Sequence, residues 1–270
     1  MPFVRAGELD VFYQRSGRGK ATVVLVHGLV MDNLASWWYT LAGPLAKGAE
    51  VICYDLRGHG LTSRPPRGYA LADSVGDLVA LLDALEVARP VHLVGNSYGG
   101  VVALATALAA PGRVASLVLV EAHAAVEGQW RKEREQLAHG LDLAGIFLED
   151  AEVNDWLDRV GGRKVNRMAR RAKDLIYETT MVEDLRDSPP FSEAQLARIA
   201  CPVLLVYGER SDIFSRAVLL ERLVPKARLS VVAGVDHSVL REAPGTVRAL
   251  LGAWMEEHGA AGKVPVGGPG

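Results

Sequence analysis

A serine lies in a setting that suits a nucleophile, in the segment Gly95-Asn96-Ser97-Tyr98-Gly99. The mostly apolar residues 90–94 before this segment predict a short buried strand, and the apolar residues 101–105 after it predict a helix. A sharp turn from strand to helix strains the backbone and brings the two elements close together, so it needs small neighbours such as these glycines. The serine oxygen would then stand at a helix N-terminus, where the helix dipole favours developing negative charge. We therefore interpret Ser97 as a nucleophile.

A serine hydroxyl is a good nucleophile only beside a histidine base that a carboxylate orients. In this strand–turn–helix arrangement the expected order along the chain is serine, acid, histidine. The apolar run 202–208 predicts a strand that is followed by Asp212, and residues 228–232 predict the next strand, which is followed by His237. Three strand ends would thus bring Ser97, Asp212 and His237 to one edge of a sheet.

Nearly the whole chain, from the first strand to a helix ending near His258, resembles the α/β-hydrolase superfamily. The resemblance rests on the three residues above, on His27-Gly28 after the apolar run 23–26, and on the turn at residues 55–63. It implies a fold in which a helical cap, inserted into the chain, lies over the nucleophile.

The resemblance also implies further site residues. The backbone N–H groups of Leu29 and Tyr98 are the expected oxyanion hole, because a tetrahedral acyl intermediate carries its charge on one oxygen. Loss of one such donor typically costs about 2.7 to 4 kcal/mol. Some members of the superfamily take the acid from an earlier strand end, which here is Glu121. Glu121 is therefore the alternative to Asp212 as the acid.

Apolar strand patterns alternate with helical patterns along the chain, as in a sheet that helices cover on both faces. We predict an α/β fold with a doubly wound, mostly parallel sheet. The predicted strands are a hairpin at 4–6 and 9–15 and runs at 21–27, 51–54, 91–95, 114–121, 203–207 and 228–232. The predicted domains are a core of residues 1–121 and 191–258, a helical cap of residues 122–190, and a flexible glycine-rich tail of residues 259–270.

Composition narrows the classes of partner. The chain has 30 basic and 32 acidic residues, a net charge of −2, and so gives no reason to expect nucleic acid or a membrane. The N-terminus lacks the features of a secretory signal, and no apolar run approaches the roughly 18 residues that span a bilayer. Cys53 and Cys201 fall at apolar strand positions, as small hydrophobes do in a reducing compartment. We expect a cytoplasmic protein that uses no cofactor or metal.

The predicted cap contains a helical pattern, at residues 163–178, with a basic face. Arg163, Arg167, Arg170 and Arg171 are spaced at i, i+4, i+7 and i+8, and apolar residues form the opposite face. Charge runs of this kind are most often solvated outer faces, which is the interpretation that we favour. The alternative is a docking site for an acidic carrier protein or for the phosphates of a coenzyme A thioester.

These features predict a serine hydrolase that cleaves a carboxylic ester or thioester of a small acyl substrate through an acyl-enzyme. His237 would deprotonate Ser97 and later activate water, while Asp212 orients the imidazole. The Gly-Asn-Ser-x-Gly-Gly pattern also resembles hydrolases that cut carbon–carbon bonds in ring-cleavage products. The loop after His27 is less rich in glycine than in that group, however, and Ser238 stands where that group usually has tryptophan. A second alternative is a protein that has kept the fold only to bind a ligand.

Overall fold

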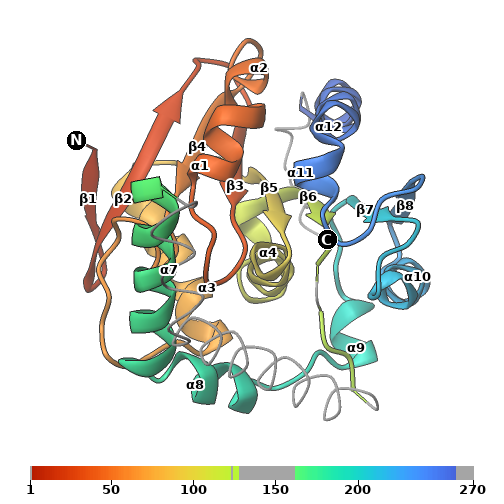
Figure 1. Ribbon diagram of the computed structural model, residues 1–270. Helices are drawn as coiled ribbons and strands as arrows, with labels where there is room; N and C mark the ends of the chain where they lie inside the picture. Colours follow the sequence, from red (N-terminus) through yellow and green to blue (C-terminus); the bar gives the residue numbers. More distant parts are fainter. Residues whose placement is uncertain (1, 123, 128–161, 260–270) are drawn as a thin grey trace, which may run out of the picture.

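The structure is a computed structural model that describes residues 2–122, 124–127 and 162–259. Within these residues, eight strands form one sheet in the order β1-β2-β4-β3-β5-β6-β7-β8 (Figure 1). β1 pairs antiparallel with β2, β2 pairs antiparallel with β4, and the remaining neighbours pair in parallel. The strands are β1 (Phe3–Ala6), β2 (Leu9–Ser16), β3 (Thr22–Val26), β4 (Glu50–Tyr54), β5 (Val91–Asn96), β6 (Val114–Val120), β7 (Val203–Gly208) and β8 (Ala227–Val232). The predicted mostly parallel sheet is confirmed.

Helices cover both faces of this sheet (Figure 1). Along β3, Val24 and Val26 belong to the apolar cluster beneath α3, α4 and α10, whereas Val23 and Leu25 belong to the cluster beneath α1, α2 and α12. This division follows from the two-residue period of a strand. The helices outside the cap are α1 (Ala35–Trp37), the π-helix η1 (Trp38–Ala42), α2 (Gly43–Leu45), α3 (Leu71–Ala84), α4 (Tyr98–Ala109), η2 (Pro111–Arg113), α9 (Glu193–Leu196), α10 (Phe214–Leu223), α11 (Val239–Glu242) and α12 (Pro244–His258).

Two helices of the predicted cap are described, α7 (Gly162–Tyr177) and α8 (Met181–Asp187). Residues 123 and 128–161 of the predicted cap, and nearly all of the predicted tail, lie outside the described residues, so the domain division stays a prediction. α7 coincides with the predicted helix 163–178. None of the helices in the described ranges is both long and apolar enough to cross a membrane.

The loop that follows β4 holds α7 and α8 in place. The side chain of Arg64 forms an ion pair with Asp174 of α7, at 3.0 Å. Near α8, the backbone N–H of Tyr69 donates to the carboxylate of Asp184 at 2.8 Å. α7 therefore has a fixed position beside the sheet edge that carries the carboxyl ends of the parallel strands.

β5 and α4 meet in a turn that only very small residues permit. A Cβ atom on Gly95 would lie 2.2 Å from the carbonyl oxygen of Gly99, and one on Gly99 would lie 2.2 Å from that of Val26. The β5–β6 ladder continues to the pair Asn96 and Val120, so Ser97 leaves the sheet directly at its edge. The helix can cross the strand this closely because both glycines lack a side chain.

Replacing Gly95 with alanine should lower the free energy of unfolding by about 3 kcal/mol, the upper end of the usual cost of overpacking, because the atoms in the way are backbone atoms. Gly112→Ala is the matched control, since a Cβ atom there meets nothing within 4 Å. Urea denaturation of the two variants measures both changes. Equal stabilities would contradict the close approach of β5 and α4.

Candidate active site

Ser97 lies in the turn between β5 and α4 with a backbone φ of 51° and ψ of −118°. A positive φ is uncommon for a residue with a side chain, and such strain gathers at functional sites. The backbone N–H of Ser97 donates to the carbonyl oxygen of Val120 at 2.8 Å. The serine therefore stands next to the end of β6, where Glu121 follows.

Glu121 presents a fully buried carboxylate that accepts three hydrogen bonds. Its Oε1 accepts the backbone N–H of Gly208 at 2.5 Å. Its Oε2 accepts the hydroxyl of Ser211 at 2.6 Å and lies 2.9 Å from Nδ1 of His237. Glu121 also has a positive φ, of 50°, which is uncommon for a residue with a side chain. The carboxylate thus joins the ends of β6 and β7 to the loop after β8.

His237 lies in that loop with its side chain 40% exposed. The hydrogen bond to Glu121 raises the pKa of His237 above its ordinary value, against the opposing effect of burial, and the negative charges of Glu121, Asp212 and Asp236 raise this pKa further. With Nδ1 donating to Glu121, Nε2 is the nitrogen left to accept a proton. The imidazole is therefore oriented and made more basic by one buried carboxylate.

We expected Asp212 to accept the hydrogen bond from the imidazole of His237. Glu121, the alternative acid, accepts it instead. The turn after β7 directs the hydroxyl of Ser211 inward to Glu121 and leaves Asp212 exposed. Asp212 acts on His237 only through its charge. Ser211 was not among the predicted site residues. For the choice of acid, the strand order favours Glu121, since β6 is the direct neighbour of β5 and β7 is one strand further from Ser97.

The loop after β3 lies against the nucleophile. A Cβ atom on Gly28 would be 3.5 Å from that of Ser97. In this loop the N–H of Gly28 donates to Oδ2 of Asp32 at 2.8 Å, and the N–H of Val30 donates to Nε2 of His59 at 2.9 Å. Of these three consecutive loop residues, Leu29 alone has an N–H with no acceptor among the described residues.

Tyr98 is the residue predicted to provide the second oxyanion donor. It is the first residue of α4, and an N–H at that position has no carbonyl partner within its own helix. Its side chain is directed elsewhere: the phenolic hydroxyl forms a hydrogen bond of 3.1 Å with the hydroxyl of Ser74 in the core. The ring of Tyr98 thus packs inside, while its N–H is left without a carbonyl partner in α4.

Two buried histidines hold the loop after β3 in place. Nε2 of His27 accepts the N–H of Leu56 at 3.0 Å, and its Nδ1 lies 2.6 Å from the carbonyl oxygen of Gly28. Nε2 of His59 accepts the N–H of Val30, and its Nδ1 lies 2.8 Å from the carbonyl oxygen of Arg57. These partners assign the neutral tautomer with hydrogen on Nδ1 to both rings. Both rings therefore hold backbone groups of these two loops in place.

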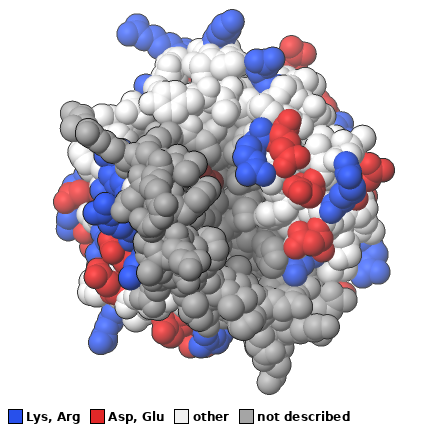
Figure 2. All heavy atoms as spheres, in the orientation of Figure 1, with Lys and Arg blue, Asp and Glu red and all other residues white. Residues whose placement is uncertain are grey.

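Within the described ranges, no group of three or more His, Cys, Asp or Glu side chains could hold a metal ion. On the face shown in Figure 2, basic and acidic side chains are interspersed, as the net charge of −2 leads one to expect.

Known proteins resemble this chain over most of its length. A family model described as "Alpha/beta hydrolase family" matches residues 23–250. A protein of Azorhizobium caulinodans assigned as the carbamate hydrolase RutD is 33% identical over 263 residues, which are 93% of this chain and 97% of that protein. A protein of Variovorax paradoxus with the same assignment is 39% identical over 147 residues, which are 53% of this chain and only 51% of that protein.

Two further proteins bear on the chemistry and on the fold. A 2-hydroxy-6-oxononadienedioate/2-hydroxy-6-oxononatrienedioate hydrolase of Paraburkholderia xenovorans is 31% identical over 273 residues, which are 93% of this chain and 87% of that protein. Among solved structures, a thermophilic esterase of Thermogutta terrifontis superposes with a TM-score of 0.75 at 21% identity, covering 95% of this chain and 98% of that one.

The pKa of His237 should fall in Glu121→Gln, because the variant loses both the charge and the ionic hydrogen bond at Nδ1. Asp212→Asn should lower the same pKa by less, since Asp212 acts only through its charge. NMR titration of the His237 ring measures both shifts. A larger fall in Asp212→Asn would return the orienting role to Asp212.

Proposed function

Because this chain belongs to the alpha/beta hydrolase family, we propose that it is a serine hydrolase that cleaves a carboxylic ester or thioester of a small molecule through an acyl-enzyme. The observation that carries this proposal is the hydrogen bond of 2.9 Å between Nδ1 of His237 and buried Glu121, beside a serine in a strained turn. A nucleophile, a base and an orienting acid are the parts that acyl transfer needs.

Acylation begins when Nε2 of His237 takes the hydroxyl proton of Ser97 and the serine oxygen attacks the carbonyl carbon of the substrate. The carbonyl oxygen becomes an oxyanion, which the N–H groups of Leu29 and Tyr98 stabilise. The bond to the leaving group then breaks, and His237 gives its proton to the departing alcohol or thiol. Ser97 is left acylated.

Deacylation repeats these steps with water as the nucleophile. His237 takes a proton from water, the resulting hydroxide attacks the acyl carbon, and the proton passes to the oxygen of Ser97 as the acid leaves. Glu121 stays ionised in both halves. It holds the imidazole in one orientation and stabilises its charged form, in agreement with the raised pKa of His237.

Cleavage of a carbon–carbon bond is the second candidate, and the relative from Paraburkholderia xenovorans favours it. The same nucleophile and base would serve a different substrate, a ring-cleavage product. The two candidates are separated by measuring kcat/KM for short and long p-nitrophenyl esters, for acyl-thioesters and for one dienoate ring-cleavage product. A higher kcat/KM for the dienoate than for every ester and thioester would transfer the proposal to carbon–carbon cleavage.

Ser97→Ala should lower kcat for the best ester or thioester on the order of 10⁶-fold, as removal of the nucleophile does in other serine hydrolases. It should also abolish labelling by a serine-directed phosphonate, read by intact mass. The thermal unfolding curve serves as the control, because the methyl group of alanine fits where the serine side chain lies. Turnover like that of the wild type would refute the mechanism.

Glu121→Gln should reduce kcat on the order of 10⁴-fold, the effect of losing the orienting carboxylate in other triads. Asp212→Asn is the matched control and should cost far less, since Asp212 is exposed and makes no hydrogen bond to the imidazole. Steady-state kinetics on one ester measures both. The reverse ranking would assign the acid to Asp212.

A further inference from the structure

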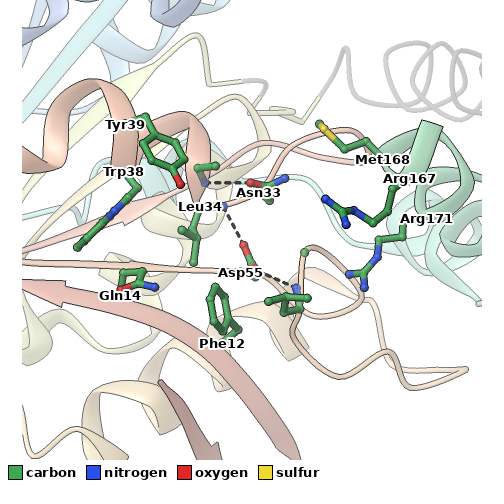
Figure 3. Close-up of a pocket in the computed structure, with 13 residues that line it drawn as sticks. Phe12, Gln14, Asn33, Leu34, Trp38, Tyr39, Asp55, Arg167, Met168 and Arg171 are labelled. Atoms are coloured by element: carbon green, nitrogen blue, oxygen red, sulfur yellow. Dashed lines mark hydrogen bonds between the residues drawn. The ribbon is translucent and has the colours of Figure 1, made fainter. Parts of the chain in front are cut away.

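A cavity of about 450 Å³ lies between α7, the π-helix η1 and the loops after β3 and β4 (Figure 3). Its volume falls in the range of small-molecule sites. Neither Ser97 nor His237 lines it, so it is separate from the proposed active site. π-Helical turns are rare and are often found at functional sites, and η1 contributes both Trp38 and Tyr39 to the wall.

Two arginines of α7 form the basic side of this cavity. Arg167 and Arg171 stand one helical turn apart and extend from α7 toward the loops that carry Asn33 and Asp55 (Figure 3). No carboxylate among the described residues pairs with either guanidinium. Like charges at this spacing repel each other and weaken a helix. An anion held between the two arginines would remove that repulsion.

Asp55 is the acidic residue of the cavity wall, and its charge is already engaged. Its Oδ1 accepts the N–H of Leu34 and its Oδ2 accepts the N–H of Leu61, both at 2.8 Å. The side chain is buried, and these two bonds fix its position. The carboxylate therefore braces two loops and leaves the arginines free to bind an external anion.

Aromatic rings lie across the cavity from the arginines. Phe12 of β2 and Trp38 are half-buried, and Tyr39 is 80% exposed. A planar ring laid against Tyr39 and Trp38 would cover this apolar surface. Guanidinium groups bind phosphate through paired, charge-assisted hydrogen bonds, and aromatic side chains stack on nucleobases. Both halves of the cavity thus match one class of ligand.

We propose that this cavity binds a phosphorylated nucleotide, with phosphate groups on Arg167 and Arg171 and the base against Trp38 and Tyr39. Coenzyme A belongs to this class, because its 3′,5′-ADP end carries both parts. The loop at residues 28–34 joins the cavity to the active site, since Gly28 lies against Ser97 and Asn33 lines the cavity. The binding step does not depend on the proposed hydrolase activity.

The test is titration calorimetry of the full chain with 3′,5′-ADP. The wild-type protein should bind it saturably, and the double variant Arg167→Ser with Arg171→Ser should bind at least tenfold more weakly. Arg170→Ser is the matched control, because Arg170 is exposed on the same helix but does not line the cavity. The affinity of this variant for 3′,5′-ADP should stay within twofold of the wild-type value. Added salt should weaken binding by the wild type more than by the double variant.

Tyr39→Ala tests the aromatic half of the cavity. It should weaken the binding of 3′,5′-ADP at least threefold and leave the weak binding of inorganic phosphate unchanged. Thermal unfolding curves check that all variants fold.

The proposal is overturned by absence of saturable binding, by equal losses of affinity in Arg170→Ser and the double variant, or by phosphate binding as tightly as 3′,5′-ADP. If the nucleotide is the handle of a thioester substrate, the double variant also raises KM for an acyl-coenzyme A and not for a p-nitrophenyl ester. An unchanged KM beside weakened binding instead identifies a free nucleotide as the ligand.

Discussion

The buried carboxylate of Glu121 is the interaction on which the active-site edge of the sheet depends. An ionised carboxyl group in an apolar interior is costly unless donors surround it, and here three donors come from the end of β7, from the turn after it and from the loop after β8. These donors belong to Gly208, Ser211 and His237. One charge therefore fixes the relative positions of three chain segments, and the imidazole reaches its place as part of that arrangement.

The opposite side of Ser97 is organised largely by two imidazoles that accept backbone N–H groups. His27 and His59 each accept one backbone N–H and face one carbonyl oxygen, and so connect the loop after β3 to the loop after β4. The carboxylate of Asp55 adds one bond between the same loops, from the N–H of Leu34, and one within the loop after β4, from the N–H of Leu61. Ser97 thus stands between two sets of buried hydrogen bonds, one centred on Glu121 and the other on His27, His59 and Asp55.

The sequence contains most of the fold because strand and helix periodicity and the glycines around Ser97 are local signals. It identifies the serine and the histidine for the same reason. The acid is harder to predict: both Glu121 and Asp212 follow strands, and the choice depends on which side chain the turn after β7 directs inward, which local pattern does not encode. The basic face of α7 is equally hard to predict. Arg167 and Arg170 are both exposed, as a solvated face requires, but Arg167 and Arg171 also line a cavity that only the neighbouring loops create.

The contrast between His59 and His237 has a consequence for how the protein responds to acid. His59 can accept the N–H of Val30 only while its Nε2 carries no proton, and burial lowers the pKa of His59 to about 3. The hydrogen bond to Glu121 raises the pKa of His237 instead. As the pH falls through this raised pKa, the proposed base is therefore protonated while Nε2 of His59 still accepts the N–H of Val30. In the proposed mechanism this is an off state of the folded protein, because the loop after β3 keeps that hydrogen bond.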